Sequence, residues 1–106
     1  MYYERINDKS LERMIEGLCF DYERRKREIA EDKLPKRVLI EYKFLNGKIM
    51  EAAIEIVGHI DSEVMIYDIG MRRGYAKSPI NRFSEIHYKM LKAKIKLNIA
   101  KKLLLL

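Results

Sequence analysis

The apolar residues in the first third of the chain fall on one face of a helix. Their spacings of three and four residues are those of an amphipathic α-helix. The members of this stripe are Leu11, Met14, Ile15, Leu18, Cys19, Tyr22 and Ile29. Asn7, Asp8 or Ser10 can cap the first turn through a side-chain oxygen. Pro35 disfavours the α conformation in the residue before it, so the sequence predicts a helix over about residues 8–32.

From Lys36 onward the pattern changes to the alternation of a β-strand. The residues on one side of the first run are Val38, Ile40, Tyr42 and Phe44. The pair Asn46-Gly47 separates this run from a second apolar run over residues 48–57. An Asn-Gly pair between strand-forming runs is typical of a type I′ turn, because both central residues of that turn need positive φ. The sequence therefore predicts a β-hairpin over residues 36–60.

The second run is apolar on parts of both faces, which suits a strand that curves around a small barrel. Gly58 can supply the bend that closure of a barrel requires. Further strands are expected over residues 63–69, 75–78 and 86–89, with a glycine-bracketed loop over 70–74. We therefore predict an α+β fold, in which the helix precedes a small, strongly bent five-stranded antiparallel barrel over about residues 36–89.

The C-terminal segment, residues 90–106, fits two patterns. Alternate residues from Leu91 to Ile99 are apolar, as in a strand. Helical spacing is shown by Met90, Ala93, Leu97, Ala100 and Leu104. Lys, Ala, Leu and Met are strong helix formers, so we favour a helix. With no internal repeat and no break in composition, residues 1–106 are expected to form one domain.

Composition places the chain among soluble globular proteins. It has 106 residues, of which 48% are hydrophobic and 36% charged. No run of about 18 apolar residues predicts a transmembrane helix, and the first residues lack the basic-then-apolar order of a signal peptide. The single cysteine, Cys19, cannot form an internal disulfide. These features predict a cytoplasmic protein.

The positive charge is concentrated late in the chain. Residues 1–60 carry 12 Lys/Arg and 12 Asp/Glu, whereas residues 61–106 carry 10 and 4, which accounts for the net charge of +6. Such asymmetry indicates a polyanionic partner. Arginines on a loop beside an aromatic ring can contact phosphates and stack a base. The candidate nucleic-acid-binding residues are Arg72, Arg73, Tyr75, Lys77, Arg82, Lys89, Lys92 and Lys96.

The sequence contains no pattern that predicts catalysis. His59 and His87 are 28 residues apart in the chain, and neither has a cysteine or an acidic cluster at metal-ligand spacing. Cys19 lies on the apolar helix stripe, where a small core residue is the simpler interpretation. No phosphate loop, nucleophile elbow or zinc motif is present. We therefore expect no enzyme activity, no catalytic residues, no metal and no cofactor.

The order of features resembles the YolD-like family of small bacterial and phage proteins. The matching stretches are the helix with Leu18-Cys19, the run 38–42 with Asn46-Gly47, residues 57–61 and the closing segment 80–86. This resemblance covers about residues 8–89. It implies a small Sm-like or SH3-like barrel with a non-enzymatic accessory role near nucleic-acid-processing proteins. The family carries a longer N-terminal extension, and the resemblance does not account for the basic residues after Lys89.

Two functions follow as predictions. The first is a non-catalytic module that binds nucleic acid or a nucleic-acid-processing protein. The alternative is a homo-oligomeric interaction module, in which the apolar C-terminal segment pairs with another chain through Leu97, Leu103 and Leu104. No membrane partner is expected, because residues 89–106 lack the Trp or Phe that amphipathic membrane helices usually carry.

Overall fold

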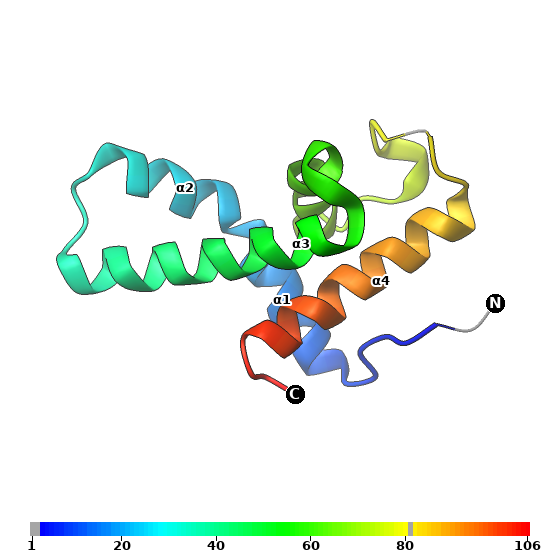
Figure 1. The fold of residues 1–106 in the computed structure, drawn as a ribbon, viewed down its shortest axis with the longest axis horizontal. Helices are drawn as coiled ribbons and strands as arrows, with labels where there is room; N and C mark the ends of the chain where they lie inside the picture. The colour runs from blue at the N-terminus through cyan, green and yellow to red at the C-terminus, as the bar shows by residue number, and fades with distance from the viewer. Residues whose placement is uncertain (1–2, 81) are drawn as a thin grey trace.

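The computed structural model describes residues 3–80 and 82–106, and in these residues the fold is helical, with no strand. The elements are α1 (Lys9–Phe20), α2 (Tyr22–Glu31), α3 (Lys36–Gly70), the short 3₁₀ helix η1 (Tyr75–Lys77) and α4 (Glu85–Lys102) (Figure 1). The predicted α+β fold with a five-stranded Sm-like or SH3-like barrel over residues 36–89 is therefore wrong.

The molecule has two parts, which we call the body and the arm. The arm consists of α2 and residues 36–48 of α3, which run antiparallel and project to one side (Figure 1). The body contains α1, the remainder of α3, η1 and α4. The projecting arm makes the molecule elongated, with extents of 46, 29 and 21 Å.

The predicted hairpin around Asn46-Gly47 is instead the middle of a continuous helix. The residues that α3 buries there are Asn46, Ile49, Ala52 and Ala53, at helical spacing. Asn46 donates to the Tyr22 carbonyl oxygen at 3.1 Å and accepts a 2.7 Å hydrogen bond from Arg25 Nε. These contacts to α2 hold Asn46 in a helix. Gly47 faces solvent, where its helical cost of about 1 kcal/mol relative to alanine is tolerated.

Gly58 bends α3 rather than closing a barrel. Its φ of 82° and ψ of 175° lie outside the helical region, and this conformation is essentially restricted to glycine. The helix resumes at once, and the residues around it that become buried are Asp61, Ser62, Met65, Ile66 and Ile69. Their three- and four-residue spacing explains why residues 63–69, predicted as a strand, form a helix.

The predicted helix over 8–32 is confirmed as helical but is divided in two at Asp21. Asp8 caps α1 by accepting hydrogen bonds from the backbone N–H groups of Ser10 and Leu11. At the division, the buried Arg25 donates to the Leu18 carbonyl oxygen near the end of α1. A cation at a helix C-terminus is electrostatically favourable, so Arg25 stabilises the junction between α1 and α2.

The C-terminal segment is a helix, as favoured, and it begins at Glu85, capped by Ser84. Residues 86–89, predicted as a strand, form its first turns, and residues 75–77 of the predicted fourth strand form η1. α4 packs across α3 and α1 (Figure 1). The core between them is built from the fully buried Ile15, Ile49, Met65, Ile66, Ile69, Tyr88, Ile95 and Ile99.

Gly70 has a structural role that the sequence did not indicate. A Cβ atom added at Gly70 would lie 2.6 Å from the backbone nitrogen of Phe20. The end of α3 therefore approaches the end of α1 so closely that only glycine fits. Residues 71–80 then lead back to α4.

Candidate functional site

Three of the predicted nucleic-acid-binding residues lie together. Arg72, Arg73 and Lys77 line a shallow hollow of about 480 Å³ at the end of α3, beside the ring of Tyr67. Arg72 Nε lies 3.1 Å from a carboxylate oxygen of Glu16. Lys77 is exposed and has no carboxylate partner among residues 3–80 and 82–106. The hollow thus offers one unpaired cation and one surface ion pair.

Arg73 is fixed by the body. Its guanidinium stacks on Tyr67 at 4.6 Å, and its Nε lies 3.0 Å from Oδ1 of the fully buried Asp68. These two atoms form an ion pair without an aligned hydrogen bond. Asp68 Oδ2 accepts hydrogen bonds from Ser78 at 2.5 Å and from Tyr88 at 2.6 Å. Burial, followed by the hydrogen bond to Asp68, raises the pKa of the Tyr88 hydroxyl. This cluster ties the 71–80 loop to α3 and α4.

Tyr75 is held against the body rather than presented for base stacking. Its hydroxyl donates a 2.7 Å hydrogen bond to the Phe83 carbonyl oxygen. Its ring meets the ring of Tyr88 edge-on, with 5.5 Å between centroids. A stacking role for Tyr75 would require this packing to open.

The remaining predicted cations are used within the molecule. Arg82 forms an ion pair with the buried Asp61, and Lys89 lies 3.3 Å from Glu85. Lys92 donates to the Arg73 carbonyl oxygen at 2.7 Å, and burial lowers the pKa of its ammonium. The positive charge of the last third is therefore largely neutralised inside the molecule.

Lys96 shows this neutralisation most clearly. Its ammonium donates to Glu12 at 2.8 Å and to Glu16 at 3.3 Å, and its side chain is only 14% exposed. The hydrogen bond from Lys96 is the main cause that lowers the pKa of the Glu12 carboxyl. Acidic residues of α1 and basic residues of α4 thus meet across the α1–α4 contact.

Residues considered for chemistry are separate from one another. Burial raises the pKa of the Cys19 thiol to about 12, as expected for a core cysteine. Within residues 3–80 and 82–106, no three His, Cys, Asp or Glu side chains converge to hold a metal ion. Nor does that part of the chain contain a helix both long and apolar enough to cross a membrane.

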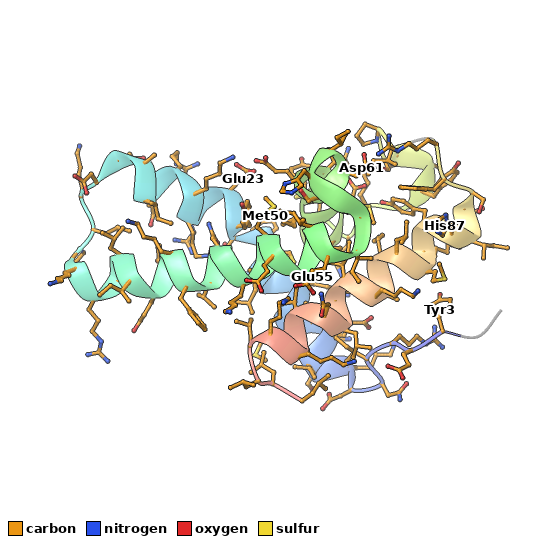
Figure 2. The ribbon with its side chains drawn as sticks, in the orientation of Figure 1. Tyr3, Glu23, Met50, Glu55, Asp61 and His87 are labelled. Atoms are coloured by element: carbon orange, nitrogen blue, oxygen red, sulfur yellow. The ribbon has the colours of Figure 1, made fainter. Side chains whose placement is uncertain are left out.

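The arm carries an apolar surface. Ile40 and Phe44, four residues apart on α3, are 59% and 54% exposed. They lie on the same side of α3 as Glu51 and Glu55, at the four- and seven-residue spacings of one helix face. Lys102, at the end of α4, holds Glu51 at 2.8 Å and Glu55 at 2.6 Å. Figure 2 shows Glu55 beside these last turns of α4.

α4 ends before this surface. α4 runs antiparallel to α3, since Asn98 contacts Glu55 and Lys102 reaches Glu51. Because α4 ends at Lys102, it stops short of Phe44 and Ile40. The arm face, as we call it, is made of Ile40 and Phe44, both exposed.

The predicted oligomer residues are divided between the core and the exposed C-terminal end. Leu97 and Leu103 pack partly against the core, whereas Leu104 is 88% exposed. Sequence reasoning missed Ile40 and Phe44 as surface residues because it assigned them to a strand. Helical spacing places Ile40 and Phe44 on a different helix face from the buried Asn46 and Ile49.

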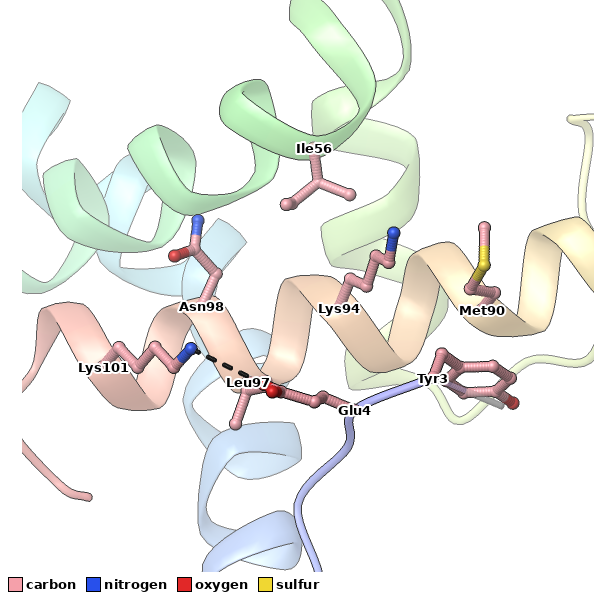
Figure 3. A pocket seen from close by; sticks show the side chains of 8 residues that line it. All are labelled: Tyr3, Glu4, Ile56, Met90, Lys94, Leu97, Asn98 and Lys101. Carbon is pink, nitrogen blue, oxygen red and sulfur yellow. Dashed lines mark ion pairs between the residues drawn. The ribbon is translucent and has the colours of Figure 1, made fainter. Parts of the chain in front are cut away.

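A second surface lies on α4. A groove of about 360 Å³ is lined by Ile56 of α3, by Tyr3 and Glu4 of the N-terminal segment, and by α4 side chains (Figure 3). The lining side chains from α4 are Met90, Lys94, Leu97, Asn98 and Lys101. Apolar and polar side chains contribute to it about equally, and its two lysines are positively charged. The sequence signal for this groove was the helical spacing of Met90 and Leu97.

Comparison with known proteins gave no assignment: no family model, no curated protein and no solved structure matches the chain. The resemblance to the YolD-like family stays a prediction, although the barrel that it implied is absent from the described residues.

Proposed function

We propose that the chain is a non-catalytic helical interaction module that associates with a second copy of itself through the arm face. The observation that carries this proposal is the exposure of Ile40 and Phe44 on a two-helix arm, where no third helix of residues 3–80 and 82–106 covers them. Apolar side chains clustered on one exposed face are typical of protein–protein contacts. Pairing of two such arms would complete a four-helix arrangement.

The charges beside the arm face favour a second copy as the partner. Glu41 and Lys48 lie three residues before and four residues after Phe44, on the same flank of the helix. In an antiparallel pair centred near Phe44, Glu41 of one copy would face Lys48 of the other, twice by symmetry. The Glu41 contact within the chain, with Arg37 at 3.7 Å, is exposed and so opposes this exchange only weakly.

Phe44 would be the central contact of this pair. Lys48 lies 5.9 Å from its ring centroid and 3.8 Å from Glu51, so the ring is bordered by a cation that can remain hydrated at the rim. Aromatic residues at the centre of an interface, surrounded by polar residues, commonly carry much of the binding energy.

The test is the mass in solution of Phe44→Glu compared with the wild type. Light scattering should give the mass of two chains for the wild type and of one chain for the variant. Ile60→Glu is the matched control, because Ile60 is 82% exposed but lies outside the arm face, and it should leave the dimer intact. A wild-type chain that is monomeric at the highest soluble concentration would contradict the proposal, as would a dimer that survives Phe44→Glu.

Nucleic-acid binding at the 71–77 loop is a second candidate function. It is supported by the convergence of Arg72, Arg73 and Lys77 on one hollow. Phosphate contacts release counterions, so affinity for a short labelled oligonucleotide should fall steeply with salt. Arg72→Ala with Lys77→Ala should weaken binding, whereas Lys33→Ala with Lys36→Ala should not. Equal loss in both double variants would point to non-specific attraction instead.

A further inference from the structure

The groove on α4 differs from the arm face in its combination of apolar and charged side chains. Ile56, Met90 and Leu97 present apolar atoms to it, and Lys94 and Lys101 stand seven residues apart along its length (Figure 3). Seven residues of α-helix span about 10 Å. The groove therefore offers two cations about 10 Å apart, with Leu97 and Asn98 between them on α4 and Met90 beyond Lys94.

A comparison of the lysines of α4 shows which of them are available to a partner. Lys89, Lys96 and Lys102 form ion pairs with Glu85, with Glu12 and Glu16, and with Glu51 and Glu55. Lys92 is half-buried and donates to a backbone carbonyl oxygen. Within the described residues, Lys94 alone among the α4 lysines has neither a carboxylate partner nor a hydrogen bond to the protein.

Lys101 is only weakly held. Its ammonium lies 3.9 Å from a carboxylate oxygen of Glu4, and the two side chains are 58% and 72% exposed. An exposed pair at this distance contributes little to stability. Glu4 nevertheless shows the kind of group that the groove accommodates: a carboxylate beside Lys101, with Tyr3 near Met90 (Figure 3).

We propose that this groove is a docking site for an acidic amphipathic helix of a partner protein. Two carboxylates seven residues apart on that helix would meet Lys94 and Lys101. Apolar side chains on the same face of that helix would pack on Ile56, Met90 and Leu97, in the helix-in-groove mode of recognition. The floor contains aliphatic and thioether side chains, which suit an apolar helix face better than the bases of a nucleic acid.

The test uses a fluorescein-labelled synthetic helical peptide with two glutamates seven residues apart and leucines between them. It should bind the wild type saturably, and Lys94→Glu with Lys101→Glu should weaken binding by about tenfold or more through charge repulsion. A second peptide, with lysines in place of both glutamates, should bind that double variant and not the wild type. Binding by this reversed pair would also show that the variant is folded.

The matched control is Lys33→Glu with Lys43→Glu, which changes the net charge equally at exposed lysines outside the groove. This control should leave binding of the acidic peptide unchanged. No saturable binding by the wild type, or an equal loss in both double variants, overturns the proposal. The proposal is also overturned if Lys94→Glu with Lys101→Glu selectively weakens binding to an oligonucleotide or to anionic phosphatidylserine vesicles and does not weaken binding to the peptide. Phe44→Glu should still bind the peptide, because the two surfaces are separate.

Discussion

The body and the arm share the helix α3, yet they bury their apolar residues to different extents. In the body, α3 is covered by both α1 and α4, and residues such as Ile66, Ile69 and Ile99 are inaccessible to solvent. In the arm, α2 is the one described helix beside it (Figure 1), and Ile40 and Phe44 remain exposed. An apolar helix face is buried only where another element packs on it. In the arm, no described element packs on the face that carries Ile40 and Phe44.

Their polar interactions differ in the same way. The body contains the buried Asp68 cluster, which joins α3, the 71–80 loop and α4. Along the arm, ion pairs such as Arg37–Glu41 and Arg27–Glu31 are exposed pairs within single helices. Such pairs contribute only a few tenths of a kcal/mol each. The body is therefore expected to set the stability of the fold and the arm to provide a surface.

Removing the Asp68 carboxylate should have the largest effect. Asp68→Ala leaves Arg73 without its anion and Ser78 and Tyr88 without their acceptor, and breaking a buried pair in this way costs about 3–5 kcal/mol. Urea unfolding followed by circular dichroism measures the loss. Arg37→Ala in the arm is the control and should cost under about 0.5 kcal/mol. Similar losses in the two variants would contradict the distinction between body and arm.

Shortening one isoleucine in the body and one in the arm tests whether the two parts contribute differently to stability. Ile99→Ala creates a cavity between α4 and α3 and should lower the free energy of unfolding by roughly 2–5 kcal/mol. Ile40→Ala should leave the stability of the single chain nearly unchanged but weaken self-association. Both variants are measured by unfolding at a concentration where the chain is monomeric, and by light scattering at a higher one. A large loss of monomer stability in Ile40→Ala would mean that the arm face is packed within the chain.

A smaller effect is expected where the arm joins the body. Asn46→Ala removes the acceptor for Arg25 and the donor to the Tyr22 carbonyl oxygen. Leaving such buried groups unpaired costs about 1–3 kcal/mol. Hydrogen exchange of the α2 amides should become faster than that of α4. Equal acceleration in both helices would show that the arm does not open separately.

The smallest change is expected to stabilise the protein. Gly47 lies inside α3, and a Cβ atom added there meets nothing within 4 Å. Gly47→Ala should therefore raise the free energy of unfolding by about 0.5–1 kcal/mol. In a type I′ turn, the same substitution would destabilise because Gly47 would need positive φ. Thermal unfolding distinguishes the two outcomes by the direction of the shift.

The parts of the fold that the sequence predicted correctly depend on local signals. Asp8 caps α1 through its own first turn, and the Lys, Ala and Leu content of residues 90–102 favoured the helix that α4 forms. Residues 36–57 could not be assigned in this way, because their apolar positions satisfy strand and helix periods alike. The contact that holds Asn46 in a helix comes from Arg25, 21 residues earlier, and spacing within a single segment does not reveal it.

The concentration of positive charge late in the chain predicted a polyanionic partner, whereas the structure pairs much of that charge within the molecule. Lys96 and Glu12 are 84 residues apart in the chain and 2.8 Å apart in space. A count along the sequence records the lysine as an available cation, because the pairing depends on the tertiary packing of α1 against α4. Conversely, the sequence does not distinguish Lys94 from the other lysines of α4. The structure distinguishes it, because it shows the protein partners of those other lysines.

The central claim is that a second copy covers the arm face in an antiparallel arrangement, and a mixing experiment tests it most directly. Glu41→Lys and Lys48→Glu should each weaken the homodimer, because each sets like charges opposite one another. Sedimentation equilibrium should show each variant alone as a monomer. An equimolar mixture should form a heterodimer, since both opposite-charge pairs are then restored. Two variants that dimerise as well as the wild type, or a mixture that remains monomeric, would contradict the account.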